Sequence, residues 1–149
     1  MKLITGALVI CAGLALAGTA AADPWVDYTP QKGGWEVTTV KVDPNHVDDY
    51  LVGLKNAWVP QMEALKRHGV IDSYSVMVKL NSGAGDNVIL LQHYPTLANL
   101  EPEKTRDMAL MAEGRAQMSK EAGEKLTNGF DKYRSFSSDE IWTGIEYPK

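Results

Sequence analysis

One histidine, His93, has the sequence surroundings of a reactive group. It lies near the end of an apolar run and alternates with Ile89 and Leu91. Residues two apart on an extended strand point to the same side, so His93 could face an apolar cavity. A histidine there could act as a general base or as a haem ligand, although a hydrogen-bonded histidine in the core or at its rim would give the same pattern. We take His93 as the candidate catalytic residue.

Four aromatic residues and one arginine could line a pocket for a planar, largely apolar molecule. They are Tyr50, Trp58, Tyr74, Arg115 and Trp142. Arg115 lies within an apolar stripe, so it could meet an anionic ligand, pair with a buried carboxylate or extend to solvent. The aromatic residues could equally be ordinary parts of the core. We take all five as candidate ligand-binding residues.

Neither a metal site nor a cofactor is predicted. The histidines after the N-terminal segment, His46, His68 and His93, do not have metal-ligand spacing. Met108 and Met111 fall on one helical face with Met118 and could offer thioethers to Cu(I), but methionines at this spacing equally fill a core.

These candidates must be positioned by alternating strands and helices. Period-two and β-branched patterns predict strands, and apolar residues three and four apart predict helices. We predict strands over residues 35–42, 70–80, 88–94 and 138–147, and helices over residues 44–68 and 97–126, the second with a stripe that includes Met108, Met111 and Arg115. The order β-α-β-β-α-β predicts an α+β, ferredoxin-like domain, in which an antiparallel four-stranded sheet carries both helices on one face.

The ends of the first predicted helix have specific signals. Asp43 is a suitable N-cap and Pro44 suits the first helical position. Pro60 should kink the helix, and Gly69 should end it.

The strand over residues 88–94 is apolar on both faces. Helices cover only one face of such a sheet, so something else must cover the other. A second copy of the chain, packed sheet against sheet, satisfies this requirement, and we predict a homodimer.

Several segments together resemble a known superfamily. They are Asn56-Ala57-Trp58-Val59-Pro60, Gly69 to Val76, a glycine-rich hairpin and a strand ending in Gln92-His93-Tyr94. In these features the chain resembles the dimeric α+β barrel superfamily, especially its NIPSNAP-like and antibiotic-biosynthesis-monooxygenase-like members. The resemblance covers residues 35–147 and implies two ferredoxin-like halves that close a barrel by dimerisation. That superfamily includes cofactor-free monooxygenases, haem-binding enzymes and isomerases, but none of its catalytic sets maps residue by residue here.

The N-terminus has the pattern of a secretory signal peptide. Lys2 precedes an apolar stretch, and the small residues Ala20 and Ala22 suit signal peptidase. We therefore predict a signal peptide over residues 1–22, cleavage between Ala22 and Asp23, and a periplasmic or secreted mature protein. The only cysteine, Cys11, lies within this signal, so the mature chain has neither disulfides nor thiols.

The mature chain of 127 residues has the length of one domain. Residues 23–34 are predicted to form an N-terminal arm, with Trp25 and Tyr28 docking on a domain over residues 35–149. Loss of Lys2 leaves 14 basic residues against 19 acidic ones, a formal charge of −5. This charge disfavours nucleic acid and anionic lipid surfaces.

Three functions are compatible with these observations. The first is binding of a small, largely apolar molecule between sheet and helices. The second is a cofactor-independent monooxygenase or isomerase with His93 as base, and the third is a structural or stress-related interaction protein with a filled interior. A cavity beside His93 would favour the first two functions, and whether the chain is an enzyme is left open.

Overall fold

The chain is represented by a computed structural model that describes residues 22–81, 84–118, 123–124 and 128–149. The strands are β1 (Thr29–Pro30), β2 (Gly34–Val42), β3 (Ser73–Val78), β4 (Val88–Tyr94), β5 (Arg134–Trp142) and β6 (Ile145–Glu146). The helices are α1 (Val47–Arg67) and α2 (Lys104–Gln117), each preceded by a 3-10 turn, η1 (Pro44–His46) and η2 (Leu97–Leu100).

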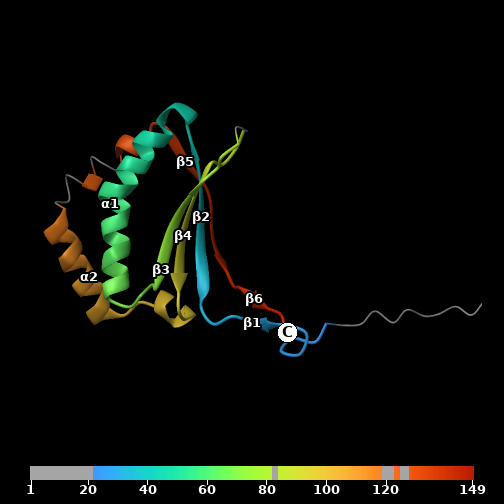
Figure 1. The fold of residues 1–149 in the computed structure, drawn as a ribbon. Coiled ribbons are helices and arrows are strands. Elements are labelled where there is room, and N and C mark those ends of the chain that lie inside the picture. The colour runs from blue at the N-terminus through green and yellow to red at the C-terminus, as the bar shows by residue number, and fades with distance from the viewer. Residues whose placement is uncertain (1–21, 82–83, 119–122, 125–127) are drawn as a thin grey trace, which may run out of the picture.

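Four strands form one antiparallel sheet in the order β3-β4-β2-β5. The two central strands are therefore the first and third of the long strands in the chain. Both helices lie on the same side of this sheet, with α1 next to it and α2 farther out (Figure 1). This is the ferredoxin-like arrangement, and it confirms the predicted fold class.

The ends of α1 follow from local chemistry. The Asp43 side chain accepts a hydrogen bond from the Asn45 amide at 2.9 Å, and Pro44 opens the turn η1 that leads into the helix. At the other end Gly69 has a φ of 68°, a left-handed conformation that favours glycine. Pro60 lies inside α1, which is a single helix from Val47 to Arg67.

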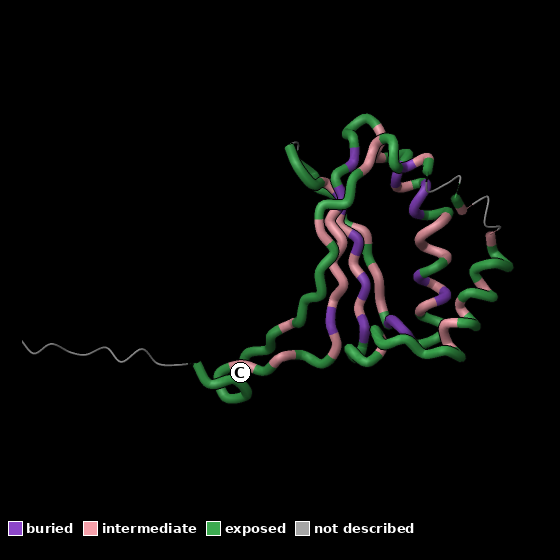
Figure 2. Tube along the Cα trace, turned by 180° about the vertical axis from the view of Figure 1, so that it is seen from behind, coloured by how far each residue is buried: buried purple, intermediate pink, exposed green. Residues whose placement is uncertain are grey.

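The core lies between α1 and the sheet and consists of two clusters. The first is Val40, Val42, Tyr50, Leu54, Val88, Leu90 and Phe130. The second is Met62, Val70, Ile71 and Tyr94. Trp58, on the middle of α1, is partly buried and packs against both clusters. Purple segments in Figure 2 mark these buried stretches of the strands and of α1.

The predicted last strand, residues 138–147, is wrong in its bounds. β5 begins earlier, at Arg134, and ends at Trp142. Thr143 and Gly144 are not part of a strand, and they separate β5 from the short strand β6. β6 pairs with β1, where the Gln31 amide also donates to the Gly144 carbonyl at 2.8 Å. We call residues 23–33 and 143–149 the arm. It extends away from the lower end of the sheet (Figure 1), and Trp25 in it is 71% exposed.

The predicted second helix is also different. The described part of residues 97–126 contains η2 and α2, and residues 119–122 and 125–127 lie outside the described residues. The predicted stripe is not a core face, because Met108 and Met111 are about 60% exposed. α2 instead turns Leu110 and Glu113 inward, and Glu113 bonds Arg67 and His68 of α1. The helix is thus held to α1 largely by polar contacts.

Candidate functional site

A cavity of about 550 Å³ lies between α1 and the sheet. It is lined by Leu54, Ala57, Trp58 and Gln61 of α1, by Glu36 and Thr38 of β2, by Leu90 and Gln92 of β4, by Arg134, Phe136 and Asp139 of β5, and by Phe130. The walls therefore combine aliphatic and aromatic surface with a few converging polar groups, which is the usual make-up of a small-molecule site.

The edge of the cavity at β5 is accessible. α2 packs on the outer side of α1 (Figure 1), and the cavity lies over β2 and β5 on the helix side. Phe136 points to that side, as its register with buried Val40 shows, and is 58% exposed. It therefore gives the β5 edge of the cavity one accessible apolar side chain between Arg134 and Asp139.

Arg134 supplies the positive charge at one end of the cavity. Its guanidinium carbon lies 4.6 Å from the Phe136 ring centre, 5.1 Å from that of Phe130 and 5.6 Å from that of Tyr50. The polar contacts of its Nη atoms are long, 3.4 Å from Nη1 to the Tyr50 hydroxyl and 3.7 Å from Nη2 to Asp131. Although the side chain is only 10% exposed, its buried Nε has no hydrogen-bond acceptor among the described residues. An unpaired buried donor costs about 1–3 kcal/mol.

The other end of the cavity carries two carboxylates on neighbouring strands. Glu36 accepts a 2.6 Å hydrogen bond from the Tyr94 hydroxyl, and Asp139 accepts one of 3.1 Å from Thr38. Burial, and then the bond to Glu36, raise the pKa of Tyr94 well above its ordinary value, so this phenol stays protonated and donates. Each carboxylate keeps further acceptor positions for another donor.

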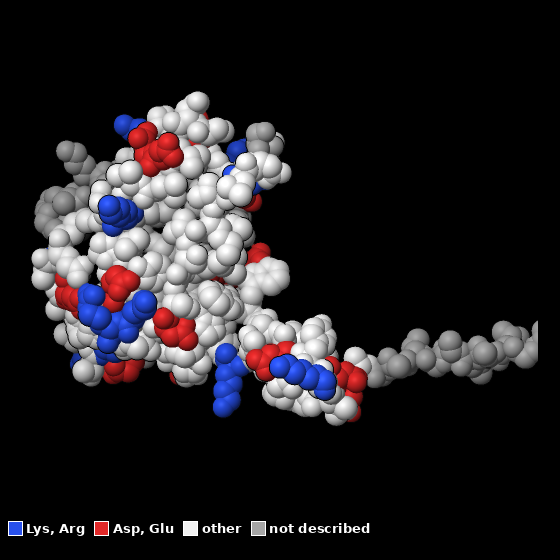
Figure 3. Space-filling model, viewed as in Figure 1, with Lys and Arg blue, Asp and Glu red and all other residues white. Residues whose placement is uncertain are grey.

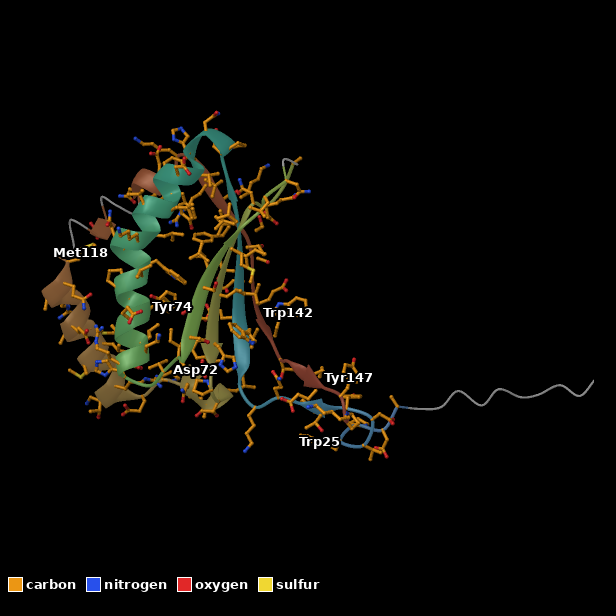
Figure 4. All side chains as sticks on the ribbon, viewed as in Figure 1. Trp25, Asp72, Tyr74, Met118, Trp142 and Tyr147 are labelled. Carbon is orange, nitrogen blue, oxygen red and sulfur yellow. The ribbon has the colours of Figure 1, made fainter. Side chains whose placement is uncertain are left out.

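Of the predicted ligand-binding residues, Trp58 lines the cavity and two others support its walls. Tyr50 is fully buried and packs edge-on against Phe130, with ring centres 5.5 Å apart. Tyr74 packs edge-on against Trp58 at 5.4 Å and donates a 2.6 Å hydrogen bond to Glu63. Figure 4 shows Tyr74 in the space between β3 and α1.

The remaining candidates lie elsewhere. Arg115 is exposed on α2. Trp142 is on the opposite side of the sheet and is 55% exposed (Figure 4). His93 also faces that side, because it pairs with Trp35 of β2 while its neighbours Gln92 and Tyr94 face the core. The structure therefore does not bring His93 and Trp58 into one cavity.

His93 has its own polar surroundings. Its Nδ1 lies 2.8 Å from Asp72 Oδ1, and its ring lies 4.7 Å from Trp35. The hydrogen bond with His93 is the main cause that lowers the pKa of Asp72. His93 also borders a hollow of about 590 Å³, whose other walls are Glu146 and arm residues that include Trp25 and Lys32.

We call the side of the sheet away from the helices the open face. Strand register places on it Trp35, Val37, Thr39, Lys41, Ser73, Ser75, Met77, Ile89, Leu91, His93, Ser135, Ser138, Glu140 and Trp142. Six of these fourteen side chains are apolar. The described residues leave this face without a covering layer, and Met77 is 53% exposed.

Sequence reasoning missed the charged residues of the cavity. Arg134 fell outside the predicted last strand, and Asp139 lay within it but was not among the candidate site residues. Glu36 had a usable signal, since it alternates with Thr38 and Val40 on one face of a strand. Nothing local indicated that this face would border a cavity.

The part of the chain that the structure describes contains no cluster of three or more His, Cys, Asp or Glu side chains that could hold a metal ion. Within the same residues no helix is both long and apolar enough to span a bilayer. The side of the molecule in Figure 3 mixes acidic and basic side chains over the helices and has no large area of one sign.

Strand order and helix placement define this chain as an α+β domain of the ferredoxin-like type. No family model matches its sequence, and no curated protein matches it. Among solved structures it is similar to a dimeric protein of unknown function with a ferredoxin-like fold from Bacteroides fragilis NCTC 9343. That likeness has 15% sequence identity and a TM-score of 0.41, and covers 80% of this chain and 99% of the other. The fold assignment rests on this chain's own topology.

Proposed function

We propose that this chain is an exported protein whose mature domain binds a small organic molecule in the cavity between α1 and the sheet. The observation that carries the proposal is the cavity itself, about 550 Å³ with apolar walls and polar groups at two ends. A structural protein with a filled interior needs no such space, so the cavity favours binding over that alternative.

A cavity-filling substitution tests ligand binding. Ala57 lines the cavity from α1, and Ala57→Leu should occupy part of the space without removing a core contact. We expect binding of the neutral fluorophore Nile red to weaken at least tenfold. Trp25→Ala, on the exposed arm, is the control and should leave binding unchanged. Equal binding by wild type and Ala57→Leu would contradict the proposed site.

Export rests on the N-terminal pattern of a charged residue, an apolar stretch and small residues before Asp23. The test is the intact mass of the protein recovered from its own host. The expected species begins at Asp23 and is found outside the cytoplasm. Full-length protein in the cytoplasm would overturn this part of the proposal.

The open face supports a homodimer that packs sheet against sheet, in line with the resemblance to the dimeric α+β barrel superfamily. Pairing would remove the apolar side chains of the open face from water. These are Trp35, Val37, Met77, Ile89, Leu91 and Trp142. In light scattering, the wild type should be a dimer and Leu91→Arg a monomer. Val52→Arg, at an exposed apolar position on α1, is the matched control and should stay dimeric. A monomeric wild type at high concentration would contradict the pairing.

The His93–Asp72 pair favours a second candidate function, an enzyme with a histidine base. The 2.8 Å contact fixes the imidazole through Nδ1 and leaves Nε2 to act on a substrate. The test uses any molecule that co-purifies with the protein. Wild type should convert it and His93→Gln should not, and conversion by both would remove His93 from the reaction.

A further inference from the structure

The cavity has a positive end that is incompletely paired. Arg134 is nine-tenths buried, it lines the cavity, and its Nε has no acceptor among the described residues. Three aromatic rings surround the guanidinium, but rings do not accept its hydrogen bonds as an oxyanion does. A guanidinium keeps its charge at all working pH values and presents donors in a fixed plane. Its surroundings therefore suit an anionic group.

The two polar ends lie on the same side of the sheet and are separated by apolar surface. Arg134 pairs with Val42, and Asp139 pairs with Thr38, four residues away along β2. At the usual rise per residue this places their backbones about 13 Å apart. Leu54 and Leu90 line the cavity as well. A ligand that uses both ends must therefore have an apolar body.

The balance of charge limits the anionic group. Arg134 lies 3.7 Å from the exposed Asp131, and the same cavity carries the carboxylates of Glu36 and Asp139. A doubly charged group such as a phosphate monoester would gain one cation and meet two anions, whereas a single carboxylate leaves the far end free for a donor.

We propose, building on the proposed binding function, that the ligand is an organic monocarboxylate with an apolar body and a hydrogen-bond donor at its far end. Its carboxylate meets Arg134, its body lies against Trp58, Leu54 and Leu90, and its donor meets Glu36 or Asp139.

Three probes of equal chain length test this chemistry on the mature protein by titration calorimetry at low salt. They are methyl octanoate, octanoate and ω-hydroxyoctanoate. We expect octanoate to bind about tenfold more tightly than methyl octanoate, because the ester has neither the charge nor a donor and octanoate adds a charge-assisted hydrogen bond. ω-Hydroxyoctanoate should bind about fivefold more tightly than octanoate, because its hydroxyl donates to a carboxylate.

Substitutions at Arg134 test whether this residue causes the preference for octanoate. Arg134→Met should bind octanoate no more tightly than methyl octanoate, and Arg134→Lys should keep part of the preference. Lys132→Met, which removes an exposed cation two residues away, should behave as wild type. Thermal melts show whether each variant is folded, and the wild-type comparison of octanoate with its methyl ester needs no variant.

The outcomes separate the two proposals. If methyl octanoate binds wild type as tightly as octanoate, or if folded Arg134→Met keeps the preference for octanoate, the monocarboxylate inference is overturned and the binding function stands. If no probe binds wild type, both are overturned.

Discussion

The two faces of the sheet use the same strands but differ in what covers them. On β4, Val88, Leu90 and Tyr94 are buried beneath α1, whereas Leu91 and His93 on the open face are partly exposed. Alternation along the strand separates these two sets of residues. The helices then determine which set becomes core, and the incomplete cover that they give creates the cavity. The sheet thus has a cavity on one side, where we propose ligand binding, and an exposed, partly apolar face on the other, where we propose association.

The largest expected effect compares adjacent leucines on the two faces. Leu90→Ala should lower the free energy of unfolding by about 2–5 kcal/mol, because it removes buried methyl groups and leaves a void. Leu91→Ala should cost less, roughly 1 kcal/mol, in dilute, monomeric protein, since that side chain is only partly buried. Urea denaturation measures both. Equal losses in dilute protein would mean that the open face is covered within one chain.

A second substitution tests the tight packing on the covered face. Gly53 of α1 is buried, and a Cβ added to it would overlap the Phe130 ring. Gly53→Ala should therefore destabilise the protein by about 1–3 kcal/mol, in spite of the better helix propensity of alanine. Gly114→Ala on α2, where a Cβ meets open space, is the control and should be neutral or stabilising in thermal melts.

The third prediction concerns alkaline pH. The pKa of Tyr94 is raised, first by burial and then by its bond to Glu36. The pKa of Tyr94 is higher in the folded than in the unfolded protein. The contribution of its protonated hydroxyl to the free energy of unfolding is therefore complete below about pH 10 and is lost as the pH rises further. Tyr94→Phe should cost about 1–2 kcal/mol at neutral pH and should weaken the loss of stability above pH 10. Parallel alkaline unfolding curves for variant and wild type would contradict this role.

The smallest effect is expected on the open face. The pKa of Asp72 is lowered, chiefly by its bond to His93, so its contribution is present above the ordinary value of 3.8 and is lost as the pH falls through the lower folded value. Asp72 is half-exposed, and Asp72→Asn should cost less than about 1 kcal/mol at neutral pH. The variant should also flatten the acid limb of the stability curve, which His93→Gln should flatten as well. If the free energy of unfolding of either variant falls as steeply in acid as that of wild type, the Asp72–His93 pair does not contribute to stability.

The fold could be predicted because its signals are local. The β-branched run before Asp43, the N-cap with Pro44, and Gly69 each determine an element boundary through backbone chemistry. The order of the strands and helices then leaves few topologies. Strand β4 was predicted with its observed bounds.

The helix α2 shows why the rest could not be predicted. Its sequence offers a stripe through Met108 and Met111, and burial would normally follow such a stripe. In the structure Glu113 instead meets Arg67 and His68 on α1, and such a long-range polar contact leaves no period in the sequence. The cavity lies over the sheet, where the predicted stripe would have placed α2. Neither the cavity nor its charged end at Arg134 could therefore be predicted from the sequence pattern. Trp58 was found because it lies on a clear helical stripe.

The pairing of β1 with β6 also brings the residues that follow the predicted signal peptide next to residues 145–146. Thr29 lies opposite Glu146 and Pro30 opposite Ile145, so few residues separate the ends of the arm. A short linker from Lys149 to Asp23, with new termini opened in the loop between β3 and β4, should give a circular permutant with the same sheet. We therefore expect that the fold does not require the strands to be synthesised in their natural order.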